Sequence, residues 1–234
     1  VPYGTKSPAL VKRFAREDLA FLETRRVKLV VVACNTVSSI ALPELAKAAR
    51  VPVVGVLMPG ARAAAAATRR GRIAVIGTPA TIRSRAYETA LRAIRADLEI
   101  ASFACPLFVS LAEEGWVDDE VALLVARRYL APLARFGADT LVLGCTHYPL
   151  LGGVISRVAG EGVVLVDSAR ETAADVERTL AADGLLRGEG PGGRIAVCLS
   201  DIPDRFAGIG ARFLGRPVEE VEQVEDVFEM ERCR

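Results

Sequence analysis

The feature that most constrains this chain is a repeated alternation between short apolar runs and longer amphipathic stretches. The short runs are rich in Val, Ile and Leu, which is typical of parallel strands covered on both faces. They occupy residues 27–33, 51–56, 72–77, 97–103, 139–144, 162–167 and 194–200. The amphipathic stretches, with apolar residues at three- and four-residue spacing, occupy residues 7–25, 38–50, 80–95, 118–137 and 168–186. The alternation predicts an α/β fold with parallel-type sheets and right-handed crossovers.

Three local signals refine this pattern. Ser7-Pro8 and the acidic residues 118–120 indicate helix starts, because a hydroxyl cap and negative charges satisfy the free N–H groups of a first turn. Residues 57–71 contain a Pro-Gly turn and a stretch of small residues, which we interpret as a helical crossing between two domains. Residues 27–36 and 138–147 share the order apolar strand, Cys, then polar residues, which favours an internal duplication.

Charge and hydropathy exclude several classes of protein. The 30 Lys and Arg residues nearly balance 29 Asp and Glu residues, and no basic cluster indicates a nucleic-acid interface. No apolar run reaches the ~18 residues of a membrane span. The first residues, VPYGTKS, lack the features of a secretory signal. We therefore expect a cytoplasmic protein with no nucleic acid or membrane partner.

The cysteines are few, scattered and odd in number. They are Cys34, Cys105, Cys145, Cys198 and Cys233. The absence of a C-x-x-C pair argues against a disulfide framework and favours a reducing compartment. A structural metal is not expected either, because His147 is the only histidine. We interpret Cys105 and Cys198 as core residues and Cys233 as part of the tail.

Two of the cysteines lie where a ligand is expected. Cys34 and Cys145 each follow a predicted strand, and ligands of open α/β sheets bind at the carboxyl ends of strands. If the two halves face each other, both thiols line one cleft. One thiolate then removes a proton from a carbon while the other thiol protonates the opposite face, which inverts the configuration. His147, two residues beyond Cys145, is expected in the same site.

Six segments in this order give the chain a family resemblance. They are PYGTKS (2–7), ACNTVS (33–38), GTPAT (77–81), CPLFVSLAEEG (105–115), GCTHYPLL (144–151) and VDSARETA (166–173). Together they resemble the glutamate racemases, which are cofactor-independent isomerases of the aspartate/glutamate racemase superfamily. The resemblance implies two similar α/β domains with glutamate bound between them. It implies a discontinuous domain of residues 1–57 plus 168–234 and a second domain of residues 58–167.

The resemblance also implies roles for individual residues. Cys34 would deprotonate D-glutamate and Cys145 would deprotonate L-glutamate, with no cofactor and no metal. His147 would assist Cys145, and Glu113 would be the nearby carboxylate, with Glu114 as the alternative. The substrate-binding residues implied by the motifs are Pro2, Tyr3, Gly4, Asn35, Thr36 and Thr146. The resemblance further implies a homodimer and a supply of D-glutamate for peptidoglycan synthesis, and hence a part in cell wall biogenesis and cell shape.

The front of the chain departs from the family pattern. Family members open with a strand that ends in an Asp-Ser-Gly motif, whose Asp is the expected partner of the first thiol. A second Asp precedes their PYG loop. Neither element is present before Tyr3. We therefore expect the first domain to lack its N-terminal strand, and this chain to be poorly soluble or weakly stable and nearly inactive as a racemase.

Other functions remain open from the sequence alone. A racemase of aspartate or another amino acid would share the same thiols. A Cys–His amidase would use Cys145 as nucleophile and His147 as base, which leaves Cys34 without a role. A non-catalytic amino-acid-binding remnant is a third reading. A pyridoxal phosphate enzyme is set aside, because all four lysines lie in the first fifth of the chain without a recognisable cofactor motif.

Overall fold

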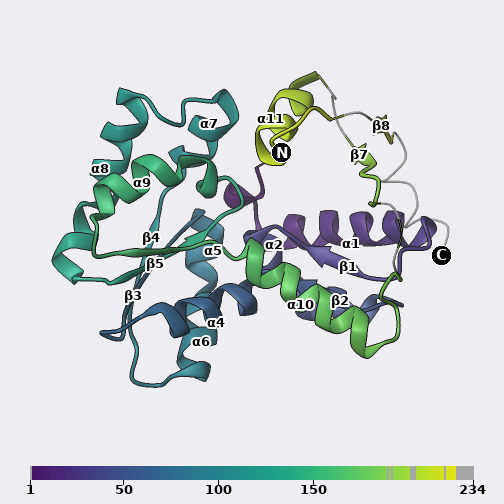
Figure 1. Cartoon of the computed structure of the whole chain (residues 1–234), viewed down its shortest axis with the longest axis horizontal. Coiled ribbons are helices and arrows are strands. Elements are labelled where there is room, and N and C mark those ends of the chain that lie inside the picture. Colours follow the sequence, from purple (N-terminus) through teal and green to yellow (C-terminus); the bar gives the residue numbers. More distant parts are fainter. Residues whose placement is uncertain (1, 189, 191, 201–203, 219, 225–234) are drawn as a thin grey trace.

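The computed structural model describes the chain except for residues 1, 189, 191, 201–203, 219 and 225–234. Two α/β lobes lie side by side, joined by α4 and by the stretch that leads into α10 (Figure 1). The first lobe contains η1 (Tyr3–Thr5), α1 (Pro8–Thr24), β1 (Val30–Val32), α2 (Asn35–Ile40), α3 (Leu42–Ala48), β2 (Val53–Gly55) and α10 (Ala169–Ala182).

The second lobe is built around one parallel sheet. Its elements are α4 (Leu57–Ala67), β3 (Arg72–Gly77), α5 (Pro79–Ser84), α6 (Ala86–Ile94), β4 (Glu99–Ala104), α7 (Leu107–Glu114), α8 (Glu120–Phe136), β5 (Thr140–Gly144), η2 (Tyr148–Leu151), α9 (Gly152–Ala159) and β6 (Val164–Val166). The strand order is β4-β3-β5-β6. After β3 the chain adds β4 on one side of β3, and it then adds β5 on the other side of β3, followed by β6. The connections thus change direction between β3 and β5, which makes this position the switch point of the sheet.

Both faces of this sheet are buried, as the continuous apolar runs predict. Successive side chains of a strand point to opposite faces. Ile73 and Val75 pack in one cluster with α4 and α6, whereas Ala74 and Ile76 pack in another with α7, α8 and α9. Figure 1 shows these two helix groups on opposite sides of β3, β4 and β5. The second lobe thus has a complete hydrophobic core that fixes the ends of its strands.

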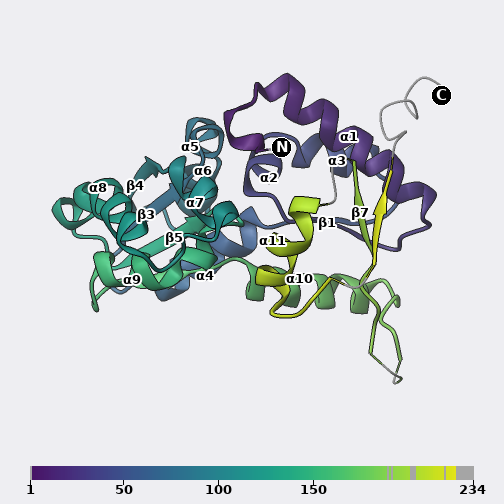
Figure 2. The same cartoon turned by 90° about the horizontal axis from the view of Figure 1, so that it is seen from above.

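The first lobe carries shorter strands. Parallel β1 and β2 pair over three residues, and the helices α1, α2 and α3 cover them. The C-terminal segment adds β7 (Val197–Leu199), α11 (Asp204–Leu214) and β8 (Val221–Gln223). The β7–β8 pair lies beside α1, and Arg25 at the end of that helix forms an ion pair with Glu222 of β8 (Figure 2).

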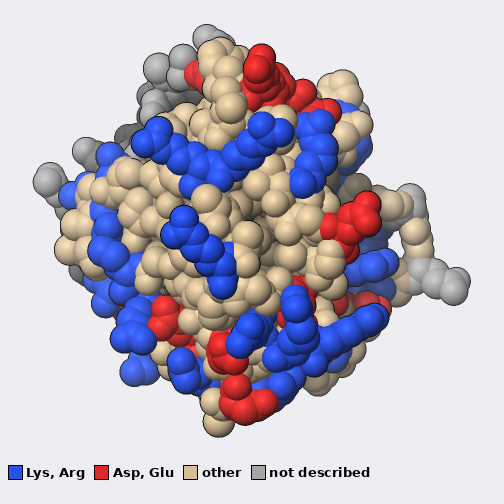
Figure 3. All heavy atoms as spheres, turned by 90° about the vertical axis from the view of Figure 1, so that its left-hand side faces the viewer, with Lys and Arg blue, Asp and Glu red and all other residues tan. Residues whose placement is uncertain are grey.

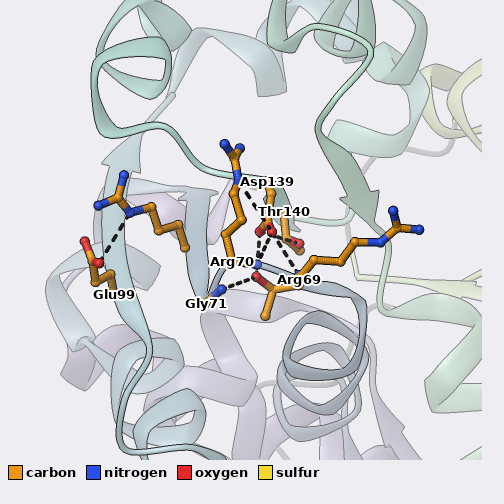
Figure 4. Close-up of polar contacts among 8 residues, drawn as sticks. Arg69, Arg70, Gly71, Glu99, Asp139 and Thr140 are labelled. Carbon is orange, nitrogen blue, oxygen red and sulfur yellow. Dashed lines mark hydrogen bonds and ion pairs between the residues drawn. The ribbon is translucent and has the colours of Figure 1, made fainter.

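A buried carboxylate ties α4 to the start of β5. Asp139 accepts hydrogen bonds from the Thr68 hydroxyl at 2.5 Å and from the backbone N–H groups of Arg69 at 2.8 Å and Arg70 at 2.6 Å (Figure 4). Burial opposes the charge on Asp139, but these donors and the Thr140 hydroxyl outweigh it, and the pKa of the carboxyl lies below its usual value. These hydrogen bonds fix the turn that leads from α4 into β3.

The outer end of the second lobe carries scattered charged side chains among uncharged ones (Figure 3). Figure 3 shows basic side chains spread over this face, with acidic ones nearer its margins. The lobe's exposed ion pairs include Arg72–Glu99 at 3.3 Å and Arg157–Asp118 at 2.7 Å. Exposed pairs contribute little to stability, so the sheet core described above holds the lobe together. Within the described residues, no helix combines the length and apolar character needed to cross a membrane.

All seven expected strands are present, mostly trimmed at their ends, and β3 matches to the residue. The helix expected over residues 38–50 divides at Ala41, and the one over residues 80–95 divides at Arg85, whose φ is +54°. The Pro-Gly pair at residues 59–60 is not a turn, because both residues lie in the first turn of α4. The helices α7, α9 and α11 and the strand β8 were not expected. The expected domain limits at residues 57/58 and 167/168 stay a prediction.

The remaining cysteines divide into three cases. Cys105 is fully buried beneath α7, which confirms its place in the core. Cys198 is exposed, and the expectation of a core residue was wrong, because β7 pairs with β8 away from the main cores and leaves this face open. Cys233 lies outside the described residues.

Candidate active site

The second-lobe thiol lies at the switch point of the sheet. Cys145 follows the last residue of β5 and is 7% exposed. Gly144 allows β3 and β5 to approach here, since a Cβ at this position would lie 2.7 Å from the Ile76 carbonyl oxygen. Burial raises the pKa of Cys145 to about 12, while the backbone N–H groups of His147 and Tyr148 oppose that rise. The Cys145 thiol is therefore protonated at neutral pH.

An imidazole lies next to this thiol, and a carboxylate lies next to the imidazole. His147 Nδ1 lies 3.8 Å from the Cys145 sulfur, and Nε2 lies 3.3 Å from Oε1 of Glu113. Burial lowers the pKa of His147, and the Glu113 charge partly restores it. The carboxylate partner in the structure is Glu113 rather than its neighbour Glu114. This order of groups can move a proton between Cys145 and the imidazole.

The first-lobe thiol occupies an equivalent place. Cys34 follows β1 and is the N-cap residue of α2, where it is half-buried. Burial raises the pKa of its thiol, and the backbone N–H groups of Val37 and Thr36 act in the opposite direction. Each thiol thus sits at a strand end with backbone N–H groups facing its sulfur.

Hydrogen bonds between the lobes bring the two strand ends together. The Thr146 hydroxyl, next to Cys145, donates to the carbonyl oxygen of Ala33, next to Cys34, at 2.9 Å. A negative charge on Cys34 raises the pKa of Cys145, so the two sulfurs interact electrostatically. A small molecule held at this junction would be in reach of groups from both lobes.

A cluster of three buried threonine hydroxyls lies at the same junction. Thr36 from α2 is 2.9 Å from Thr78 and 3.1 Å from Thr81, which are 3.0 Å apart. Hydroxyls both donate and accept, so the cluster suits a carboxylate or an ammonium group. Thr78 and Thr81 were not among the expected site residues. Their only signal was the motif GTPAT, because the contact with Thr36 depends on how the lobes meet.

The other expected binding residues are placed differently. Asn35 is buried, and its Oδ1 accepts a hydrogen bond of 2.6 Å from Tyr87, so this oxygen holds the lobes together. Gly4 lies against Thr78, where a Cβ would come within 2.4 Å of the Thr78 side chain. The loop of Pro2, Tyr3 and Gly4 therefore reaches the threonine cluster, but the Tyr3 hydroxyl points to Asp18, at 3.3 Å.

An apolar cavity of about 650 Å³ lies behind Cys34. Its lining comes from α1, β1 and the C-terminal strands, with Tyr3, Asp18 and Cys198 among the polar members. No second-lobe residue lines it, so it is distinct from the junction between the thiols. Among the residues that the structure describes, no group of three or more His, Cys, Asp or Glu side chains is placed to hold a metal ion.

Comparison with known proteins assigns the family. The profile of the Asp/Glu/hydantoin racemase family matches residues 1–176. The chain belongs to this family. Among curated relatives, a glutamate racemase of Geobacter metallireducens is 54% identical over 96% of this chain and 83% of the relative. One from Chlorobaculum tepidum is 44% identical, with the same shares covered.

Solved structures agree with this assignment. Glutamate racemase isoform RacE1 of Bacillus anthracis superposes with a TM-score of 0.91 at 38% identity, over 96% of this chain and 84% of that one. The Francisella tularensis glutamate racemase, solved with D-glutamate, gives a TM-score of 0.91 at 33% identity, over 98% and 85% of the two chains. An allantoin racemase of Klebsiella pneumoniae, at 20% identity and a TM-score of 0.52, shares the fold alone. The racemase family and the two-lobed α/β fold are thereby established.

Proposed function

We propose that this chain is a glutamate racemase that interconverts L- and D-glutamate with its two thiols. The observation that carries the proposal is the meeting of two strand ends, each bearing a cysteine, through the hydrogen bond from Thr146 to Ala33. The four glutamate racemases named above, at 33–54% identity, support glutamate as the substrate.

The proton transfers balance without an external reagent. The thiolate of Cys34 takes the α-proton of D-glutamate and becomes a thiol, and the Cys145 thiol protonates the resulting carbanion on its other face. The product is L-glutamate, and Cys145 is left as a thiolate. The reverse reaction starts from that thiolate. Because burial raises the pKa of both thiols, the sulfur that acts as the base in a given direction must lose its proton as substrate binds, Cys145 to the imidazole and Cys34 to solvent.

The remaining site residues have supporting roles in this scheme. His147, held by Glu113, takes the proton from Cys145 before L-glutamate is deprotonated. Pro2, Tyr3 and Gly4 form the loop over the threonine cluster, while Asn35, Thr36 and Thr146 bind the carboxylate and ammonium groups. Hydroxyls and N–H groups suit this task, because a desolvated zwitterion needs many hydrogen bonds. No cofactor takes part.

The cellular role follows from the product. D-glutamate made in the cytoplasm, where free thiols persist, would supply peptidoglycan synthesis. We also propose that the chain acts as a homodimer, a state that sedimentation would test directly.

Deuterium exchange at the α-carbon tests the reaction even when turnover is slow. The chain is incubated with L- or D-glutamate in D₂O, and loss of the α-proton signal and gain of the other enantiomer are followed by NMR and circular dichroism. We expect exchange from both enantiomers in the wild type, loss of exchange from D-glutamate in Cys34→Ser and from L-glutamate in Cys145→Ser, and loss of most racemisation in both variants. Cys198→Ser, an exposed thiol away from the junction, is the matched control. Undiminished racemisation in either active-site variant would refute the two-thiol scheme.

The same samples test an amidase. Cys145, His147 and Glu113 are in line, which is also the order of a nucleophilic triad. Ammonia release from glutamine that needs Cys145 but not Cys34 would identify that activity instead.

A further inference from the structure

The helix α11 crosses from the C-terminal strands to the second lobe. It lies between β7 and β8 in the sequence, and those strands lie beside the first lobe, yet its C-terminal end rests against α7 (Figures 1 and 2). Two consecutive residues, Arg212 and Phe213, make the contacts. Neither belongs to a motif that the proposed reaction uses.

Arg212 caps the C-terminal end of α7. Its Nη1 donates to the carbonyl oxygens of Glu113 at 3.1 Å and Ala112 at 3.4 Å. The guanidinium lies directly over Gly115, where a Cβ would be 2.5 Å from Nη2. A cation at a helix C-terminus satisfies carbonyls that have no partner within the helix and opposes the negative end of its dipole. The contact therefore fixes the backbone that carries the Glu113 side chain.

Phe213 contacts His147, the other member of the Glu113–His147 ion pair. Its ring meets the His147 imidazole edge to face, with centroids 5.8 Å apart and planes inclined by 80°. His147 in turn lies between Glu113 and the Cys145 sulfur. The helix α11 therefore contacts both members of the ion pair, the Glu113 backbone through Arg212 and the His147 ring through Phe213.

We propose that Arg212 and Phe213 are positioning residues that set the Glu113–His147 pair, and through it the thiol of Cys145. The proposal rests on the proposed racemase function. Glu113 and Cys145 face the imidazole, and Arg212 lies behind the Glu113 backbone. Releasing α11 lets the carboxylate move from the ring. The kcat of the direction that needs Cys145 as base, from L- to D-glutamate, then falls more than the kcat of the reverse.

The experiment compares Arg212→Ala, Arg212→Lys and Phe213→Leu with Arg216→Ala. The control removes an equally exposed arginine from the same segment without a contact to α7. Turnover and KM are measured in both directions. We expect kcat from L-glutamate to fall about tenfold in Arg212→Ala, the cost of one charge-assisted hydrogen bond, and about tenfold in Phe213→Leu, the cost of one aromatic contact. The reverse kcat should fall less, with a compensating fall in KM for L-glutamate relative to KM for D-glutamate, because the enantiomers have equal free energy and kcat/KM stays equal in both directions. Lys at position 212 should recover part of the loss in kcat.

Because the chain has one histidine, its imidazole NMR signals report the ion pair without reference to turnover. Glu113 raises the pKa of His147, so Arg212→Ala should lower that pKa relative to wild type and to Arg216→Ala. An unchanged titration together with equal losses in both directions would overturn the proposal. If the wild type does not racemise glutamate, the proposed function fails, while the titration still decides the positioning role. If Arg212→Ala does not fold, the other two variants decide the question. A fall in kcat from L-glutamate in Phe213→Leu, with a smaller fall in Arg212→Lys, supports the proposal. Wild-type kcat and a wild-type His147 titration in Phe213→Leu overturn it.

Discussion

Asp139→Asn should destabilise the chain more than any exposed charge substitution in the second lobe. One carboxylate oxygen, Oδ2, accepts the N–H groups of both Arg69 and Arg70, and the other accepts the Thr68 hydroxyl (Figure 4). An asparagine offers only one acceptor oxygen, so in its better orientation that oxygen accepts the two backbone N–H groups and the amide –NH₂ replaces the acceptor of the Thr68 hydroxyl. One bond to a charged acceptor is lost, at about 1.5 kcal/mol or more, and the two N–H bonds lose their charge assistance, so the total loss is about 3 kcal/mol.

For a chain of this size, about 3 kcal/mol lowers Tm by about 6–12 °C, measured by thermal unfolding followed by circular dichroism. Asp97→Asn, which removes an exposed partner of Arg95, is the control and should change Tm little. The pKa of Asp139 is depressed, so its contribution is present above the unfolded pKa of about 3.9 and is lost as the pH falls through the folded pKa. A Tm within 2 °C of wild type at pH 7, or a difference that grows below pH 4, would refute this reasoning.

Three shorter predictions concern the junction between the lobes. Gly4→Ala places a Cβ 2.4 Å from the Thr78 side chain, so the loop must move; KM for glutamate should rise about tenfold, and an unchanged KM would show that the loop does not touch substrate. Tyr87→Phe leaves the buried Asn35 oxygen without its 2.6 Å donor and should cost about 1–3 kcal/mol in urea unfolding; a loss under about 0.5 kcal/mol would contradict a bond that holds the lobes. Alkylation of Cys145 by iodoacetamide, followed by peptide mass spectrometry, should still be accelerating at pH 10, because burial raises the pKa of this thiol to about 12; a plateau below pH 8 would mean a thiolate in the empty site.

The strands were predictable because their signal is local. A run that is buried on both faces is apolar throughout, and β3 shows it: every residue after Arg72 in that strand is buried. The strand β8 escaped notice because its three residues are all exposed, so no burial pattern marks it. The break at Arg85 was equally hidden. An arginine with φ of +54° carries no sequence signature, and the packing of α5 against α2 and of α6 against α4 decides where the chain bends.

The site was predictable only where its residues are neighbours in sequence. Cys145 and His147 belong to one turn, Cys145 follows β5 directly, and only Ala33 separates Cys34 from β1. The cluster of Thr36, Thr78 and Thr81 depends instead on the strand order, which brings the end of β3 beside the end of β5 and both against α2. No spacing rule reveals that contact.

Glu113 shows the same limit on a smaller scale. The resemblance left two adjacent glutamates as alternatives. Adjacent residues of a helix point about 100° apart, so only one of them can face the imidazole. The position of α7 over η2, which no local pattern encodes, selects Glu113.

The repeated order of strand, cysteine and polar residues acquires a physical meaning at the two thiols. Each chain segment leaves a parallel strand and turns at once into a helical conformation, α2 after Cys34 and the turn of residues 145–148 after Cys145. Such a turn directs successive backbone N–H groups back at the residue that precedes it, and successive N–H groups bind anions. At Cys34 these donors come from Thr36 and Val37, and at Cys145 from His147 and Tyr148. Burial holds both thiols neutral, while the same turn can stabilise whichever sulfur becomes a thiolate. A pair of bases that must exchange roles between the two reaction directions needs this symmetry. Among the residues that the structure describes, the imidazole beside Cys145 breaks this symmetry, so variants of His147 or of the residues that position it should change the ratio of the two kcat values before they abolish either.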